Sequence, residues 1–539
     1  MSSPAMVDTT PQSTMVCGIL SRTAIFLLLA ACVLLLHFPL LHLPYFWDEA
    51  GYYVPAARDL FLSGSLIPHS TPSNAHPPLV MAYLAIGWKM LGFSPLATRS
   101  VMVLLSAFSL TGLFLLAESI SNREVALAAV FCTALYPVVF TESSLAQVDL
   151  PAAGFTFWGL LAYVKKRWSI SAFWFCLAAL SKETAIITPL ALFTWCLICH
   201  LGLPNRVRRI CPEKPAEARV LWLLVPVLPL ALWYGYHYLR TGYVFGNPEF
   251  FRYNVQSTFS PLRILLAFGL RLWQIFGYLQ LGLLTVAMLF AMSKPPLRDK
   301  DVERPRISLP TQFAFYAVIA AYVMIMAFIG GAVLARYMLP VVPLVIVIAI
   351  STLWRRLRYW RVLVAAVALA FAIALVVNPR YGFSLEDNLA YRDYILLHQD
   401  AESYLQTHYP SARVLTAWPA SDEIARPYLG YVHQPMRVFR IEDFTAEQVM
   451  SALDMASQFD VALVFSTKYE PSRPLMPRWP AWERLKTRFF GFHRDLPPAA
   501  AAQILAGKIV FSETRKGQWV AVIETGKIIE ANVAAEMRR

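Results

Sequence analysis

The chain has 539 residues, of which 57% are hydrophobic and 15% are charged, and its net charge at neutral pH is +13. Soluble domains carry about a quarter charged residues, so this composition excludes an ordinary soluble protein. A basic balance of this size would suggest nucleic-acid binding in a soluble protein. Here the basic residues gather in short segments between apolar runs and form no nucleic-acid motif, so we expect no nucleic-acid partner.

Apolar runs long enough to cross a bilayer follow one another through the first two thirds of the chain. Such a crossing needs about twenty apolar residues. No small-residue cleavage site follows the first run, so we expect an anchor helix rather than a removable signal peptide. The runs predict an all-α polytopic membrane domain of about eleven transmembrane helices, near residues 23–43, 97–117, 124–141, 150–165, 169–185, 186–203, 219–238, 272–293, 312–334, 337–354 and 361–378.

Basic residues mark every second loop between these runs. Loops on the cytoplasmic side are enriched in Lys and Arg, which sets the orientation. We therefore expect a cytoplasmic segment at 1–22, a membrane domain at 23–378 and a domain outside the cytoplasm at 379–539, in a multi-pass protein of the inner (plasma) membrane. The basic loops contain Arg123, then Lys165, Lys166 and Arg167, then Arg206, Arg208, Arg209 and Lys214, then Lys294, Arg298 and Lys300, then Arg355, Arg356, Arg358 and Arg361.

The first outer loop, 44–96, contains two short helical patterns. Pro55 can open a helix that Gly64 ends. The apolar stretch 79–92 is too short to span a bilayer. We expect both to be helices that lie along the membrane interface.

Two adjacent carboxylates, Asp48 and Glu49, lie within the aromatic segment Tyr45–Tyr53, directly after the first apolar run. Trp and Tyr favour the membrane–water interface. Carboxylates at an apolar boundary cost several kcal/mol unless they are paired or solvated. The pair therefore predicts a polar function at the outer membrane surface.

Other charged residues fall at the outer ends of the runs, and each has a structural alternative. Asp149 can cap a helix start, and Arg336 can reach the interface with its long side chain. His76 can be an ordinary interfacial histidine. Lys182 and Glu183 are adjacent, so they cannot face each other on one helix, and each either pairs elsewhere in the bundle or binds a ligand.

The order of these motifs over roughly residues 23–345 resembles the GT-C superfamily, in particular bacterial protein-mannosyltransferases and aminoarabinose transferases of glycosyltransferase families 39 and 83. The motifs are Trp47-Asp48-Glu49, His76-Pro77-Pro78-Leu79, Arg99, Asp149-Leu150-Pro151, Ser181-Lys182-Glu183 and Arg336-Tyr337-Met338-Leu339-Pro340. The resemblance implies a membrane glycosyltransferase that uses a polyprenyl-phosphate sugar as donor at the outer leaflet.

The resemblance also implies roles for the site residues. Asp48 matches the catalytic base, and Glu49 is the companion that orients the base or a substrate hydroxyl. A carboxylate within hydrogen-bond reach can take the proton of an attacking hydroxyl, and direct attack would invert the anomeric centre. Arg336, His76 and Lys182 are expected to bind the lipid phosphate, because a departing phosphate needs cationic donors. Asp149, Tyr337 and Glu183 are expected to line the substrate site.

The chain departs from these relatives at two motifs. His76 stands where aminoarabinose-type enzymes tend to carry Lys, which weakens the expectation of a lipid A acceptor. Glu183 follows Lys182 where relatives often carry Gly. We find no acidic cluster with clear metal-ligand spacing, so the sequence assigns no metal site, and a divalent metal stays open.

Residues 379–539 are predicted to form a small soluble α/β domain. Residues 412–418, 460–465 and 519–524 have strand patterns, and 422–429 and 445–456 have helix patterns. We interpret the domain as a lid or an acceptor platform without catalytic residues.

Two other functional classes remain open. A polytopic transporter or lipid flippase also buries charges, but transporters often show internal repeats and midplane charges; here no repeat is evident and the charges lie near the outer surface. A membrane anchor for the tail would not explain acids and bases on six outer segments. The sequence does not identify the sugar, the acceptor (protein, lipid or glycan), the polyprenyl length or the oligomeric state.

Overall fold

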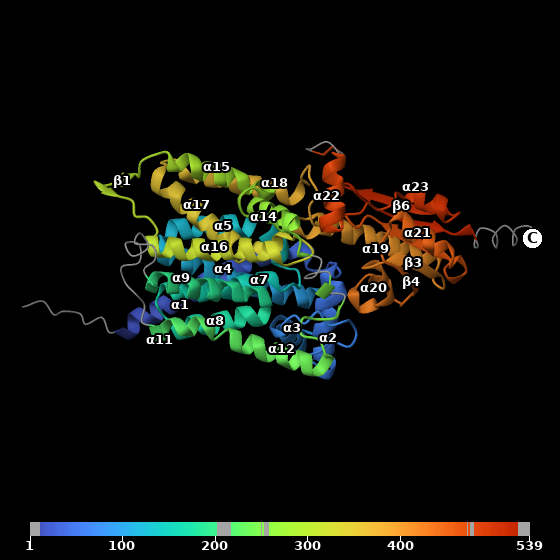
Figure 1. Cartoon of the computed structure of the whole chain (residues 1–539), viewed down its shortest axis with the longest axis horizontal. Helices are drawn as coiled ribbons and strands as arrows, with labels where there is room; N and C mark the ends of the chain where they lie inside the picture. Colours follow the sequence, from blue (N-terminus) through green and yellow to red (C-terminus); the bar gives the residue numbers. More distant parts are fainter. Residues whose placement is uncertain are drawn as a thin grey trace, which may run out of the picture.

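The computed structural model describes residues 11–201, 217–248, 251–252, 258–471, 473–474 and 479–526. Figure 1 shows long helices running along the long axis of the molecule, with a smaller C-terminal domain at one end. The helices of the membrane domain are α1 (Pro11–His37), α2 (Val54–Ser63), α3 (Leu79–Leu91), α4 (Pro95–Ile120), α5 (Arg123–Leu135), α6 (Pro137–Glu142), α7 (Asp149–Val164), α8 (Trp168–Ser181), α9 (Ile187–Leu201), α11 (Glu217–Val220), α12 (Val227–Thr241), α14 (Pro261–Phe276), α15 (Leu281–Met292), α16 (Leu309–Phe328), α17 (Val342–Arg356) and α18 (Trp360–Val376).

The polytopic membrane domain predicted from the apolar runs is confirmed. Among the described residues, six helical stretches are long and apolar enough to cross a membrane, and shorter apolar helices accompany them. The predicted span 97–117 lies within α4, which begins where Ser94 accepts a hydrogen bond from the amide of Ala97 at 3.1 Å. The predicted span 124–141 is divided into α5 and α6 at Pro137, because proline cannot continue the hydrogen-bond ladder.

The prediction of one span at 272–293 is wrong in detail. Helix α14 ends at Phe276, and α15 begins at Leu281. Between them, Leu279 and Gln280 have φ angles of 45° and 71°. Two consecutive residues in the left-handed region end a helix. The prediction also missed the first half of α14, where Arg263 and Arg271 interrupt the apolar pattern.

Several basic loops that were predicted to be cytoplasmic meet at one end of the bundle. Arg361 pairs with Glu124 at 3.1 Å, and Arg356 Nη1 donates to the carbonyl oxygen of Met292 at 3.2 Å. This end carries the short hairpin β1 (Arg298–Asp299) and β2 (Val302–Glu303), and Figure 1 shows it opposite the C-terminal domain. Arg206, Arg208, Arg209 and Lys214 lie outside the described residues, as do residues 1–10 of the predicted N-terminal segment.

Both helices that were predicted in the first outer loop are present. Helix α2 ends at Gly64 with a φ of 74°, and α3 ends at Gly92 with a φ of 81°. Such left-handed ends favour glycine, which has no Cβ. Both helices lie near the end of the bundle that meets the C-terminal domain (Figure 1). Their orientation along a membrane surface stays a prediction.

The C-terminal domain has the predicted α/β class. Its five-stranded sheet has the order β4-β3-β5-β7-β6. Strand β3 is parallel to β4 and β5, whereas β7 is antiparallel to β5 and β6. The elements are α19 (Ala390–His408), β3 (Arg413–Ala417), α20 (Ala420–Ala425), β4 (Arg437–Ile441), α21 (Ala446–Leu453), β5 (Val461–Phe465), α22 (Pro480–Phe490), α23 (Pro498–Ile504), β6 (Lys508–Arg515) and β7 (Gln518–Glu524).

The C-terminal domain and the first outer loop share one apolar core. A single cluster of buried side chains contains Tyr45, Phe46 and Ala50 of the loop together with Tyr391 and Phe465 of the C-terminal domain. A second cluster fills the interior of the helical bundle. The segment that carries Asp48 is therefore packed between the two domains.

Candidate functional site

The loop before Asp48 is held in an unusual backbone conformation. Trp47 has a φ of 45°, which is rare for a bulky residue. A π-helical turn, η2 (Glu49–Tyr53), follows at once, and such turns recur at functional sites. Strained backbone persists only where the surroundings determine it, so the contacts of this loop are informative.

Glu49 supplies the main contacts that hold the loop. Arg99 of α4 donates to both carboxylate oxygens of Glu49, at 3.2 and 3.4 Å. The amides of Phe46 and Ala146 donate to the same carboxylate, at 2.8 and 2.6 Å. The side chains of Glu49 and Arg99 are fully buried. These contacts suit an orienting role for Glu49 and leave it no exposed oxygen for a substrate hydroxyl.

Asp48 faces Arg336 of the short helix η7 (Ala335–Met338). Asp48 Oδ2 accepts a hydrogen bond from Arg336 Nη2, and 32% of the Asp48 side chain is exposed, against 4% of Arg336. Arg336 also contacts Asp149 at 3.6 Å and Glu386 at 3.3 Å, and it donates to Gln147. A buried guanidinium thus joins three carboxylates from distant parts of the chain, which we call the Arg336 network.

Asp149 is the first residue of α7, but it does not cap that helix. The residue at the cap position is Val148, and no side chain makes a capping bond. Asp149 Oδ1 instead accepts a hydrogen bond from Lys182 Nζ at 2.5 Å. Both side chains are buried. The alternative reading of Asp149 as a helix cap is therefore wrong.

Three cations surround the ring of Tyr337. Lys182 Nζ lies 4.0 Å from the ring centroid, and the guanidinium carbons of Arg271 and Arg336 lie 5.5 and 5.8 Å from it. Arg271 donates to Gln274 and to the carbonyl oxygens of Met326 and Leu334. Its Nη2 is buried without a hydrogen-bond partner among the described residues. Of the three cations, Arg271 is the one that has no carboxylate contact within the described ranges.

His76 and Glu183 form a second pair beside the Arg336 network. His76 Nδ1 lies 3.0 Å from a carboxylate oxygen of Glu183. The His76 ring contacts the rings of Tyr52 and Tyr53, both at 5.7 Å between centroids. Because Lys182 and Glu183 are adjacent yet have different partners, the expectation that they do not face each other is confirmed.

The C-terminal domain packs against the Asp48 loop. Trp418, two residues before α20, contacts the ring of Trp47 at 5.2 Å. A Cβ on Gly51 would lie 2.5 Å from the Trp418 ring, so the close approach requires glycine. Glu386 and Asp387 form η8 at the entrance to the C-terminal domain. Burial raises the pKa of Glu386, and burial together with Glu386 raises the pKa of Asp387 to about 8.

The structure thus brings together five of the predicted site residues: Asp48, Asp149, Lys182, Arg336 and Tyr337. The pair of His76 and Glu183 lies beside them, and Glu49 is buried against Arg99. Sequence reasoning missed Gln147, Glu386 and the role of Arg271. The signal for Glu386 was two adjacent acids, Glu386 and Asp387, a few residues after the last apolar run.

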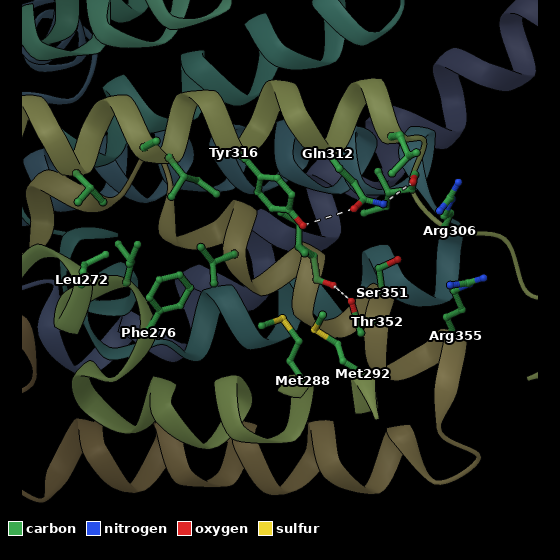
Figure 2. A pocket seen from close by; sticks show the side chains of 18 of the residues that line it. Leu272, Phe276, Met288, Met292, Arg306, Gln312, Tyr316, Ser351, Thr352 and Arg355 are labelled. Atoms are coloured by element: carbon green, nitrogen blue, oxygen red, sulfur yellow. Dashed lines mark hydrogen bonds between the residues drawn. The ribbon is translucent and has the colours of Figure 1, made fainter. Parts of the chain in front are cut away.

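A cavity of about 680 Å³ lies in the membrane domain, lined mainly by apolar side chains of α14, α15, α16 and α17. Figure 2 shows Leu272 and Phe276 at one end and Arg306 and Arg355 at the other. None of the residues of the Arg336 network lines it.

In the described part of the chain, the one group of His, Cys, Asp and Glu side chains placed to hold a metal ion is His398, Glu402 and Glu423. This group belongs to the C-terminal domain, and it is separate from the Arg336 network.

The sequence of residues 75–233 matches the family described as dolichyl-phosphate-mannose-protein mannosyltransferase. No curated protein matches the sequence. Among solved structures, the chain is similar to ArnT from Cupriavidus metallidurans bound to undecaprenyl phosphate, with 13% identity, coverage of 94% of this chain and 97% of that chain, and a TM-score of 0.49.

The same protein in the apo state is 14% identical over 93% of this chain and 98% of that chain, with a TM-score of 0.48. The archaeal oligosaccharyltransferase AglB from Archaeoglobus fulgidus, in complex with an inhibitory peptide and a dolichol-phosphate, is 12% identical over 93% of this chain and 74% of that chain, with a TM-score of 0.46. The match over residues 75–233 contains the motifs at His76, Asp149 and Lys182, and it confirms the resemblance to the GT-C superfamily of membrane glycosyltransferases.

Proposed function

We propose that this protein is a glycosyltransferase that moves a sugar from a polyprenyl-phosphate donor to a hydroxyl acceptor at the outer face of the membrane. One observation carries the proposal: a partly exposed carboxylate, Asp48, faces a group of cations around Tyr337. A base beside an anion-binding centre is what transfer from a lipid phosphate requires. The family match, to an enzyme class named for a dolichyl-phosphate sugar, supports it.

Asp48 is the proposed general base. One of its oxygens is held by Arg336, which fixes the position of the carboxylate. The exposed part of the side chain is then available to accept the proton of the acceptor hydroxyl while that oxygen attacks the sugar. No covalent intermediate is needed, so the anomeric centre inverts. Glu49 positions this loop through Arg99.

The cations around Tyr337 are the proposed phosphate site. Arg336 is already in contact with three carboxylates, so it has the least spare charge. Arg271, whose buried Nη2 has no hydrogen-bond partner in the described part of the chain, is the stronger phosphate ligand. Lys182 lies on the same ring and shares its charge with Asp149. Together they would stabilise the negative charge on the departing lipid phosphate.

The apolar cavity offers room for part of the polyprenyl chain. Leu272 and Phe276, which line it, belong to α14, the helix that carries Arg271. A lipid phosphate bound at Arg271 could therefore place its first isoprenoid units along α14. His76 stays a proposed phosphate contact beside Lys182, and its partner Glu183 stays a proposed substrate contact together with Asp149 and Tyr337.

The decisive experiment measures whether the purified protein cleaves the bond between sugar and lipid phosphate. A labelled polyprenyl-phosphate sugar is incubated with the full-length protein and an extract that contains acceptors, and the released polyprenyl phosphate is quantified. A transferase releases it, whereas a transporter or flippase returns the donor intact. Recovery of intact donor on the opposite leaflet of a vesicle, without cleavage, would replace the proposal with the transporter alternative.

The phosphate site is tested separately by the affinity for undecaprenyl phosphate in detergent. Arg271→Gln removes the charge but keeps an amide that can donate a hydrogen bond. Hydrogen bonds to charged groups contribute about 1.5–3 kcal/mol, so we expect binding to weaken roughly tenfold to a hundredfold. Arg240→Gln, which changes an exposed arginine at the end of α12, is the matched control and should bind normally. Equal affinity of the two variants would remove Arg271 from the site.

The proposal also requires that the site lie on the outer face of the membrane. The charge pattern of the loops predicts that residues 379–539 lie outside the cytoplasm. A reporter enzyme that works only outside the cytoplasm, fused after residue 378, should be active. Activity of a reporter that works only in the cytoplasm, fused at the same place, would contradict the orientation.

A further inference from the structure

A buried cluster in the C-terminal domain has no part in the proposed reaction. His398 and Glu402 lie one turn apart on α19, and Glu423 lies on α20. His398 Nδ1 is 2.6 Å from Glu423 Oε2 and 3.6 Å from Glu402 Oε1. One ligand atom from each residue lies within 4.8 Å of the others. The three side chains are at most 1% exposed.

The hydrogen-bond inventory of this cluster is incomplete. Both carboxylate oxygens of Glu402, Oε1 of Glu423 and Nε2 of His398 are buried without a hydrogen-bond partner among the described residues. Buried polar groups are normally paired, because an unpaired one loses its hydrogen bonds to water without replacement, and the cost is larger when the group is charged. Two buried carboxylates beside one imidazole repel each other, and a bound cation would remove that repulsion.

We propose that His398, Glu402 and Glu423 bind one divalent transition metal ion, with Zn²⁺ as the expected occupant. An imidazole nitrogen with two carboxylates is a ligand set that zinc uses in proteins, with a fourth position open to water. Two ionised carboxylates and a neutral imidazole carry a charge of about −2, which a divalent ion neutralises. The ion would also occupy the oxygens that otherwise have no partner.

The place of the cluster indicates a structural role for the metal. It would join α19 to α20, and Trp418, two residues before α20, contacts the Asp48 loop beside Gly51. The ring of Tyr394 stacks on His398 at 3.9 Å and touches Phe46 at 5.3 Å and Trp47 at 5.6 Å. The bound ion would therefore stiffen the surface on which the Asp48 loop rests. This inference does not depend on the proposed transferase activity.

The test is the metal content of the full-length protein, purified in detergent without chelators and with any affinity tag removed. Elemental mass spectrometry should find about one zinc ion per chain in the wild type. His398→Gln and Glu423→Gln should lose it, whereas His408→Gln, which changes an exposed histidine on the same helix, should keep it. Removal of the metal from the wild type should lower its melting temperature, and added Zn²⁺ should restore it.

Two results would overturn the inference: a wild-type protein that contains no metal and gains no thermal stability from added Zn²⁺, or a His398→Gln variant that binds as much zinc as the wild type. If the variants fail to fold, X-ray absorption at the zinc edge of the wild type decides between the outcomes. Coordination by one nitrogen and several oxygens supports the site. Sulfur ligands, or several histidines, exclude it.

Discussion

The substitution Asp48→Asn distinguishes a catalytic role of Asp48 from a structural one. Asparagine keeps the shape of the side chain and one oxygen for Arg336, but it cannot accept a proton at neutral pH. The variant leaves Arg336 in contact with Asp149, Glu386 and Gln147, so the buried guanidinium keeps two carboxylate partners. We therefore expect the protein to fold and to bind its donor nearly as well as the wild type.

The size of the activity loss follows from the role of a base. General-base assistance is worth about a hundredfold to ten-thousandfold in rate, which corresponds to roughly 3–5 kcal/mol of barrier. The effect on stability should be much smaller, because Asp48 is about a third exposed and a pair of this kind contributes at most about 1 kcal/mol. Turnover should thus fall by orders of magnitude while the melting temperature changes by a few degrees.

The assay is single-turnover release of polyprenyl phosphate from a labelled donor, with donor binding and melting temperature measured on the same preparation. Glu386→Gln is the matched control, because it also removes a carboxylate from Arg336 but leaves the base in place. Its loss of rate should be clearly smaller than that of Asp48→Asn. A near-normal rate for Asp48→Asn would refute the base, and equal losses in both variants would show that Asp48 only balances the charge of Arg336.

Three further outcomes follow from the same contacts. Arg336→Ala should lower both the melting temperature and the use of the donor, because removing one partner of a buried ion pair costs about 3–5 kcal/mol. Arg336→Lys should restore only part of each. Equal melting temperatures for the wild type and Arg336→Ala would contradict this. Gly51→Ala should lower the free energy of unfolding by about 1–3 kcal/mol, because the added methyl group would meet the Trp418 ring. Gly235→Ala, whose added methyl group would meet open space, should cause no such loss. Equal losses in thermal unfolding for the two variants would contradict the packing argument. The pKa of Asp387, about 8, lies above its value in the unfolded chain, so wild-type stability should fall as the pH rises from about 4 to 8. Asp387→Asn does not titrate, so its melting temperature should rise relative to that of the wild type over this window. A constant difference in melting temperature between pH 5 and pH 8 would contradict this expectation.

Secondary structure could be predicted from the sequence for segments that are buried on all sides, because such segments are continuously apolar. Strands β3, β5 and β7, which the sequence indicated, are the three inner strands of the sheet. Strands β4 and β6, which it missed, are the two edges. Inner strands read as continuous apolar runs, whereas edge strands expose one face and carry charges, such as Arg437 and Glu513 here. The missed half of α14 has the same cause, since two buried arginines conceal its apolar face.

The site residues were predictable as individual motifs, but their pairing was not. Asp48 and Arg336 are 288 residues apart in the sequence, and Asp149 and Lys182 are 33 apart. Only the packing of the loop before η2 against α7, the end of α8 and η7 brings these side chains together. The spacing of His398 and Glu402 on one helix face was visible in the sequence, yet the third ligand, Glu423, comes from another helix. A pair of residues at this spacing occurs too often by chance to predict a metal site without the third ligand.

The interpretation of the C-terminal domain as a lid or platform without catalytic residues leaves out its electrostatic contribution. Arg336 draws its carboxylate partners from three places: Asp48 of the first outer loop, Asp149 of the membrane domain, and Glu386 at the start of the C-terminal domain. Removing the C-terminal domain would take away Glu386 and also the aromatic surface under Trp47. The predicted boundary at residue 378 is thus a boundary in sequence composition, whereas the ion pairs and the apolar core cross it without interruption. The proposed base is held by residues on both sides of that boundary, so we expect the reaction to require both domains.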